Sequence, residues 1–168
     1  MIGYTSSTRE CSASQIHPSL YRATKEFFQS HQLGDMNSET LKCCETTSEK
    51  QTSSKLASFL DGNPDSIIHL AILLTAEWLI WARSGDRSDA IVTGTQLKLI
   101  RVKAFVTKRT KDMQLEVSGF MIDSKDYVRG NLEMGPDLAA QKFCEAVQKA
   151  VLQANPPAKR KVFGWTRD

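Results

Sequence analysis

The sequence predicts an α+β fold: a bent antiparallel sheet or partly open barrel, capped by a C-terminal helix, with an extra helix near the N-terminus. Two observations lead to this class. Strand-length apolar segments follow one another over residues 67–134 with no helical segment between them, which argues against a parallel sheet with helical crossovers. One long amphipathic segment then occupies residues 137–154, and Asn155-Pro156-Pro157 ends it.

The composition is that of an ordinary globular protein. The residues are 40% hydrophobic and 24% charged. A length of 168 residues is enough for one domain with extensions. A net charge of +3 does not by itself indicate a nucleic-acid partner, and we expect none. The cysteines are Cys11, Cys43, Cys44 and Cys144. Since none forms a CxxC pair and the N-terminus lacks a secretory signal, we expect reduced thiols in a cytoplasmic protein.

We expect a central domain over residues 40–154, an N-terminal extension over residues 1–39 and a basic, aromatic tail over residues 155–168. Residues 1–17 are rich in serine and threonine and show no periodicity, which predicts a loose lead-in. The pattern changes over residues 18–31, where apolar side chains recur at helical spacing.

This N-terminal helix places Leu20, Ala23, Phe27 and Phe28 on one side. An apolar helix face needs a surface to cover, which is either its own domain, another chain or a membrane. Docking on its own domain is the plainer alternative, and docking on a partner is the functional one.

The central part of the chain is expected to be a hairpin. A possible edge strand over residues 40–50, a short helix over residues 53–60 and a turn over residues 61–65 precede it. Two apolar segments of strand length, residues 67–75 and 77–83, then form an antiparallel pair.

The hairpin is too short and too polar to cross a membrane, because a span needs about 20 largely apolar residues. Its charged or titratable residues are His69, Glu77 and Arg83. Trp78 and Trp81 have opposite parity on their strand, so we expect them on opposite faces of the sheet, each at least partly covered.

Further strands follow the hairpin. We expect β structure at residues 89–107, 113–121 and 127–134, separated by turns or loops at residues 85–88, 108–112 and 123–126. Gly94 either divides the first of these segments into two strands or marks a bulge. The predicted total is five to seven antiparallel strands.

The last helix is expected to begin at Gly135-Pro136-Asp137, because proline suits a first helical turn and aspartate complements the helix dipole. Its apolar stripe consists of Ala139, Phe143, Val147, Ala150 and Ala154, and it is widened by Ala140, Cys144 and Val151. We expect Phe143 to be among the most buried residues, packed near Leu79 and residues 100–106. Its replacement by alanine should then cost about 3–5 kcal/mol.

Several segments together resemble a pleckstrin-homology-like (PH-like) domain of the bacterial kind, related in shape to GRAM domains. They are Leu73-Leu74-Thr75 with Trp78-Leu79-Ile80, residues 56–65, residues 96–102, and the closing helix with Phe143. The resemblance covers residues 40–154. Trp78 stands where such domains usually have a charged residue, and the terminal segments are additions. The resemblance implies a non-enzymatic scaffold that binds lipid headgroups, peptides or partner proteins.

No catalytic constellation is visible. The sequence has no phosphate-binding glycine loop and no HExxH motif. His17, His31 and His69 are too dispersed to suggest a shared metal, and a hydrogen-bonded strand histidine is the favoured interpretation of His69 over a base or ligand. The carboxylates of Asp61, Asp65, Asp86 and Asp89 flank turns and are expected to serve turn geometry. We therefore predict no catalytic residue, no metal, no cofactor and no enzyme.

Basic residues form the first candidate surface. Between Asp89 and Asp112 the chain has no acidic residue. The candidate anion- or lipid-binding residues there are Arg101, Lys103, Lys108, Arg109 and Lys111. They would hold phosphates or an anionic membrane by counter-charge. The alternative is a solvated strand face and hairpin tip, which basic residues also serve by discouraging edge pairing.

Apolar residues outside the central domain form the second candidate surface. The candidate partner-binding residues are Leu20, Phe27, Phe28, Phe163 and Trp165. The basic, aromatic tail would contact RNA, a membrane interface or its own domain, with fold-back or partner docking favoured. The sequence therefore predicts a non-catalytic protein-interaction or scaffold module, whose partner is another protein or a second copy. The alternative function is peripheral binding of anionic lipid or phosphate.

Overall fold

A computed structural model describes residues 3–51 and 64–156. Its strands are β1 (Gly3–Cys11), β2 (Lys42–Gln51), β3 (Ile67–Leu74), β4 (Trp78–Gly85), β5 (Ile91–Gln96), β6 (Ile100–Val106), β7 (Met113–Phe120) and β8 (Tyr127–Glu133). Its α-helices are α1 (Pro18–Ser30), α2 (Met36–Glu39) and α4 (Leu138–Ala154), and the short 3-10 helices are η1 (Ala13–Gln15) and η2 (Leu97–Leu99).

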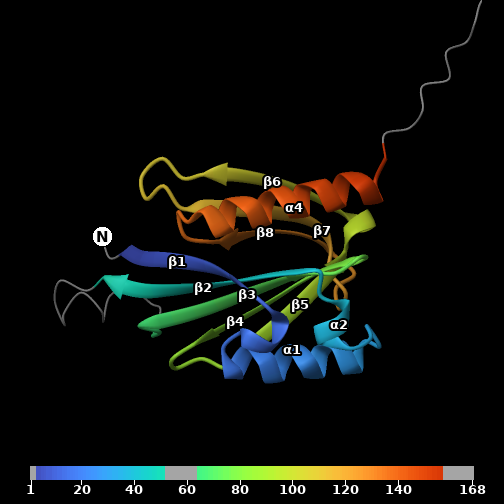
Figure 1. The fold of residues 1–168 in the computed structure, drawn as a ribbon, viewed down its shortest axis with the longest axis horizontal. Helices are drawn as coiled ribbons and strands as arrows, with labels where there is room; N and C mark the ends of the chain where they lie inside the picture. The colour runs from blue at the N-terminus through green and yellow to red at the C-terminus, as the bar shows by residue number, and fades with distance from the viewer. Residues whose placement is uncertain (1–2, 52–63, 157–168) are drawn as a thin grey trace, which may run out of the picture.

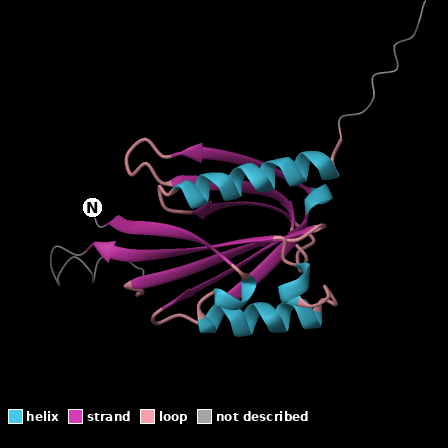
Figure 2. Ribbon diagram, in the orientation of Figure 1, coloured by secondary structure: helices cyan, strands magenta, loops and turns pink. Residues whose placement is uncertain are grey.

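The strands form two antiparallel sheets that do not close into one barrel. The larger sheet has the order β1-β2-β3-β4-β5 and the smaller has the order β6-β7-β8. The larger sheet has α1 and α2 on one side, which we call its outer face (Figure 1, Figure 2). The smaller sheet and α4 lie on its other side, the inner face. The predicted α+β class with a C-terminal helix is confirmed, with more strands than expected.

The central hairpin is confirmed. β3 and β4 pair antiparallel, with Ile72 opposite Trp81 and Leu74 opposite Leu79. The Thr75 hydroxyl accepts the backbone N–H of Trp78 at 2.9 Å and fixes the reversal. Trp78 packs against the apolar cluster under α1, while Trp81 packs against the cluster shared with α4. The two tryptophans therefore face opposite sides of the sheet, as their parity predicts.

The prediction of a loose lead-in over residues 1–17 is wrong. Nine residues of that segment form β1, which pairs with β2 along its whole length. The polar side chains that suggested a loop hydrogen-bond across the strands: Ser6 with Ser48 and Thr8 with Thr46, each at 2.8 Å. Because β1 occupies the outer position, β2 lies inside the sheet and is not an edge strand.

The N-terminal helix is confirmed as α1, and it covers the outer face. It lies against β3, β4 and β5. Gly94 neither breaks β5 nor marks a bulge, because it stays in register opposite Ile80. A side chain there would come within 3.4 Å of the Phe27 ring and 3.0 Å of Ile80, so the glycine allows the helix to approach. The chain leaves the larger sheet at η2 instead.

The C-terminal helix packs against strands of both sheets. Its contacts are with β1 and β2 of the larger sheet and with β6 and β7 of the smaller one. Its buried residues are Ala140, Phe143, Cys144, Val147 and Val151, all of which belong to the predicted stripe or to its widening, while Ala154 is exposed. Phe143 is 4% exposed and belongs to one cluster with Leu79 and Ile100, as expected.

The start of α4 is tied to β1. The helix begins at Leu138, so Pro136 lies before its first turn and Asp137 is its N-cap; the Asp137 carboxylate accepts the backbone N–H of Thr8 at 2.6 Å. The Thr8 hydroxyl in turn accepts the N–H of Gly135 at 2.7 Å. Thus the segment preceding residue 40 holds the last helix in place and is an integral part of the fold.

Candidate functional site

The candidate basic residues lie along one hairpin. Arg101 and Lys103 are exposed on β6, opposite Ser118 and Glu116 of β7. Lys108, Arg109 and Lys111 are exposed in the loop that joins these two strands. The five side chains therefore follow a strand and its tip, and they do not converge on a pocket.

The fold adds one basic and one acidic group to this hairpin that a local pattern did not indicate. Arg129 of β8 donates to the Glu116 carboxylate at 2.6 Å, and this bond raises the pKa of Arg129. Glu116 also stands directly opposite Lys103. This carboxylate partly offsets the positive charge of the strand face.

The candidate partner-binding residues of α1 are inside the domain. Leu20 is 0% exposed, Phe28 is 1% and Phe27 is 7%. The structure thus corresponds to the alternative in which the helix docks on its own domain, and these side chains offer no surface to a partner. Phe163 and Trp165 lie outside the described residues, as does the short helix expected over residues 53–60.

A cleft between the two sheets is a feature that the sequence did not indicate. It consists of two adjoining cavities of about 530 and 430 Å³. The residues that line both cavities are Trp81 and Thr93 of the larger sheet and Asn131 and Leu132 of β8. Cavities of this size are typical of ligand sites.

The chemistry of the cleft is an apolar floor with polar groups around it. Ile68, Leu70 and Ile91 extend the floor in one cavity, and Val117, Met121 and Val128 extend it in the other. Arg83, Asp89 and Glu133 are exposed charged residues that also line the first cavity. A ligand of mixed character fits such a lining better than a purely anionic one does.

The outer edge of β8 adjoins the cleft and pairs with no other strand among the described residues. β8 is the terminal strand of the smaller sheet, and all of its residues except Leu132 are exposed. The corresponding edge of β5 is partly occupied, because the Gly94 carbonyl accepts the N–H of Ile122 at 2.8 Å. The Thr95 hydroxyl likewise donates to the Phe120 carbonyl at 2.7 Å. An exposed edge such as that of β8 is a template for pairing with another strand.

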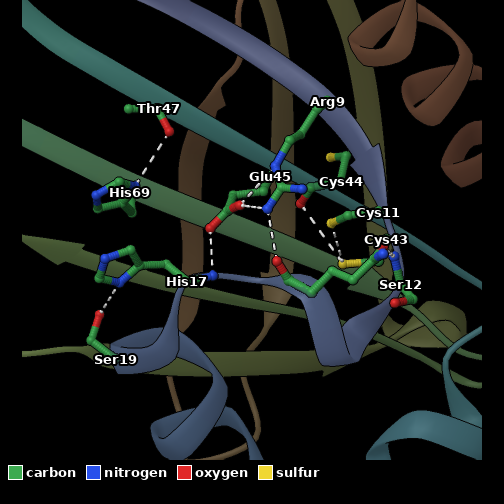
Figure 3. Close-up of polar contacts among 11 residues, drawn as sticks. Arg9, Cys11, Ser12, His17, Ser19, Cys43, Cys44, Glu45, Thr47 and His69 are labelled. Carbon is green, nitrogen blue, oxygen red and sulfur yellow. Dashed lines mark hydrogen bonds and ion pairs between the residues drawn. The ribbon is translucent and has the colours of Figure 1, made fainter.

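A polar cluster on the outer face holds the chain between β1 and α1 (Figure 3). The Glu45 carboxylate is 4% exposed and accepts Arg9 Nη2 at 2.5 Å and the backbone N–H of His17 at 2.7 Å. Arg9 Nη2 also donates to the Gln15 carbonyl at 2.7 Å, and its bond to Glu45 raises its pKa. These bonds make the Glu45 carboxylate a structural clamp between β1, β2 and the start of α1.

His69 belongs to the same cluster, where it stacks on His17 with ring centroids 4.1 Å apart. Its Nδ1 is 3.3 Å from the Thr47 hydroxyl. Burial lowers the pKa of His69, and the neighbouring His17 lowers it further. The favoured interpretation, a hydrogen-bonded strand histidine, describes this arrangement. The stacking itself joins two histidines that are far apart in the sequence.

Two of the turn carboxylates, Asp65 and Asp86, behave as predicted. The Asp65 carboxylate accepts the backbone N–H of Arg87 at 2.9 Å and the hydroxyl of Ser88 at 2.7 Å. Asp86 accepts the backbone N–H of Ser66 at 2.7 Å. Asp61 lies outside the described residues. Within residues 3–51 and 64–156, no group of three or more histidine, cysteine or acidic side chains is placed to hold a metal ion.

Comparison of the chain with family models, with curated proteins and with solved structures finds no match in any of the three. In the part of the chain that the structure describes, no helix is both long and apolar enough to cross a membrane.

Proposed function

We propose that this chain is a non-catalytic protein-interaction module of PH-like fold, and that it binds an extended peptide segment of a partner protein in the cleft between the sheets. The observation that carries the proposal is the position of the β8 edge beside an apolar floor that contains Trp81. The sequence resemblance to PH-like domains supports the same class of function.

An extended peptide suits both halves of this site. Its backbone would pair with the exposed edge of β8, and such main-chain hydrogen bonds supply affinity. Its alternate side chains would point toward the floor around Trp81 and Thr93, since successive side chains of a strand face opposite ways. Charges of both signs, from Arg83 and Glu133, would then select among peptides.

To test this proposal, peptides are selected from a displayed random library on the immobilised full chain. Calorimetry then measures their affinities for the chain in solution. Trp81→Ala should weaken binding about tenfold or more, which corresponds to about 1.4 kcal/mol. Trp78→Ala is the matched control on the same strand and the opposite face, and it should leave affinity within about twofold.

Methylation of single backbone amides in a selected peptide provides a second test. If the peptide pairs with β8, affinity should fall at every second position, because only alternate N–H groups face the neighbouring strand. Failure to select any peptide, or affinities that ignore both Trp81→Ala and amide methylation, would reject the cleft as the binding site.

A second candidate function is peripheral binding of anionic lipid by the basic hairpin. The observation that favours it is a pair of exposed aromatic rings on the same face as Arg101 and Lys103. Phe120 and Tyr127 are 45% and 59% exposed and meet edge to face at 5.6 Å. Aromatic and basic side chains together suit a membrane interface.

Sedimentation with phosphatidylserine vesicles at low ionic strength tests this second candidate. Each basic residue near an anionic surface contributes about 1 kcal/mol, so reversing the charge of Lys108, Arg109 and Lys111 should abolish sedimentation. Phosphatidylcholine vesicles are the control. A wild-type chain that ignores acidic vesicles at low salt would eliminate this function.

A further inference from the structure

Two cysteines face each other across the first pair of strands. Cys11 ends β1, Cys43 lies near the start of β2, and the two are direct register partners. Their sulfurs are 3.6 Å apart (Figure 3). Opposite residues of an antiparallel pair have Cα atoms about 4.5–5.5 Å apart, which lies within the span of about 4.4–6.8 Å that a disulfide bridges.

The two thiols differ in exposure. Cys11 is partly exposed, whereas Cys43 is 2% exposed. A hydrogen bond from the Cys43 thiol lowers the pKa of Cys11, and the nearby Arg9 guanidinium lowers it further. The same hydrogen bond and burial raise the pKa of Cys43. A partly exposed thiol with thiolate character is the reactive kind, and a buried protonated neighbour is not.

The remaining cysteines provide an internal contrast. Cys44 is 1% exposed and points to the other face of the sheet, where its sulfur is 3.9 Å from that of Met134. Cys144 is also 1% exposed, and burial raises its pKa to about 12. Both are packed as small apolar side chains.

We propose that Cys11 is a thiol-modification site that reacts with low-molecular-weight disulfides of the glutathione class, and that Cys43 is its resolving thiol. The Cys11 thiolate attacks one sulfur of glutathione disulfide, forms a mixed disulfide and releases one glutathione thiolate. Cys43 then loses its proton to that thiolate and attacks the Cys11 sulfur. The Cys11–Cys43 disulfide forms and the second glutathione leaves as thiolate, so two electrons pass from the protein to the oxidant.

The new bond would join β1 to β2 where the chain turns into η1 and α1. Cys43 belongs to the buried cluster of the outer face, and Cys11 packs against it. The site is therefore on the face opposite the cleft, and it is independent of the proposed peptide binding.

The test begins with the reduced full chain, which is equilibrated in glutathione buffers of graded oxidising strength and trapped by acid. Intact mass and peptide mapping then identify its modifications. Wild type should lose two hydrogen atoms, with the linkage mapping to Cys11 and Cys43. Cys43→Ala should instead retain one glutathionyl group on Cys11, because the resolving thiol is gone. Cys11→Ser should remain unmodified, and Cys44→Ala and Cys144→Ala are matched controls that should behave as wild type.

The proposal would be overturned if wild type stayed reduced in every buffer or formed a disulfide between any other pair. It would also be overturned if Cys43→Ala kept its fold by circular dichroism and yet remained unmodified. If Cys43→Ala does not fold, alkylation of native wild type by iodoacetamide decides instead. Cys11 should react about tenfold faster than the other three cysteines. Equal rates would refute its assignment as the reactive thiol.

Discussion

The two faces of the five-stranded sheet are covered in different ways. On the outer face, α1 contributes Leu20, Thr24 and Phe28, each at most 1% exposed, and the Glu45 clamp holds the start of the helix. On the inner face, the cover is divided between α4 and the smaller sheet. A cleft that contains the partly exposed Trp81 remains on that side.

The difference follows from the shapes of the covering elements. Helix α1 is about 20 Å long and lies against three strands, and Ala13, Ile16 and Met36 from the adjoining segments complete its buried cluster. On the inner face, α4 packs against β1 and β2, and β8 is the last strand of the smaller sheet among the described residues. The outer face is thus closed over a buried cluster, whereas the inner face retains the cleft in which we propose that a peptide binds.

Removing an aromatic ring from each region should give the largest contrast. Phe28→Ala on the closed face should cost about 3–5 kcal/mol of unfolding free energy, and Phe143→Ala under α4 should cost about the same, because both rings are buried. Trp81→Ala should cost less than about 2 kcal/mol, since its ring partly borders the cleft. Urea denaturation measures all three. A Trp81 cost equal to that of Phe28 would mean that the cleft is closed core.

Oxidation of the outer-face cysteine pair should have the next largest effect. A disulfide between Cys11 and Cys43 closes a loop of about 30 residues, for which chain entropy gives about 3–4 kcal/mol of stabilisation. Denaturation of the oxidised and reduced chains measures it, with Cys44→Ala as a control that retains the effect. An oxidised chain no more stable than the reduced one would show that the bond strains the strands as much as it restrains the unfolded chain.

Local sequence patterns were sufficient for the most apolar elements. Two apolar runs of strand length at residues 67–83 predicted the central hairpin, and helical spacing predicted α1 and α4. β1 was missed because its serine and threonine side chains satisfy one another across the strands, which gives no apolar alternation. The Ser6 hydroxyl bonds that of Ser48, which lies 42 residues away in the sequence, so no local pattern could indicate the pairing.

The candidate site was much less predictable than the fold. The cleft depends on how the smaller sheet lies over the larger one, and no short stretch around Trp81 or Asn131 encodes that placement. The cysteine pair depends on the register between β1 and β2, and α1 and α2 separate these two strands in the sequence. The basic hairpin was visible as a charge run, but its neighbours Glu116 and Arg129 became apparent only through strand pairing.

Removing a buried hydroxyl on the outer face should give a smaller, stabilising effect. Among the described residues, the Thr24 hydroxyl is buried without a hydrogen-bond partner. Thr24→Val keeps the shape and removes the unsatisfied group, so it should stabilise the chain by about 1–3 kcal/mol. Thr46→Val is the matched control: Thr46 bonds Thr8 at 2.8 Å, so its loss should destabilise by about 1 kcal/mol. A destabilised Thr24→Val chain would contradict the assignment.

The smallest effects concern two histidines that respond to pH in opposite directions. Burial lowers the pKa of His69 on the closed face. Its contribution to stability is therefore complete above the unfolded value of about 6.5 and is lost as pH falls. His31 at the end of α1 bonds Asp123, in the loop between β7 and β8, at 2.9 Å, and this bond raises its pKa. Its contribution is complete below about pH 6.5 and is lost as pH rises through its folded-state pKa.

Glutamine replacements separate these two contributions. Relative to wild type, His69→Gln should gain stability as pH falls from about 8 to about 5, whereas His31→Gln should lose it over the same range. Each change should be below about 1 kcal/mol, since Asp123 is 68% exposed and the His69 ring is only partly buried. Urea midpoints at both pH values measure the differences. A gain of stability by His31→Gln as pH falls would mean that the bond from His31 to Asp123 does not form, and a loss by His69→Gln would mean that burial does not lower the pKa of His69.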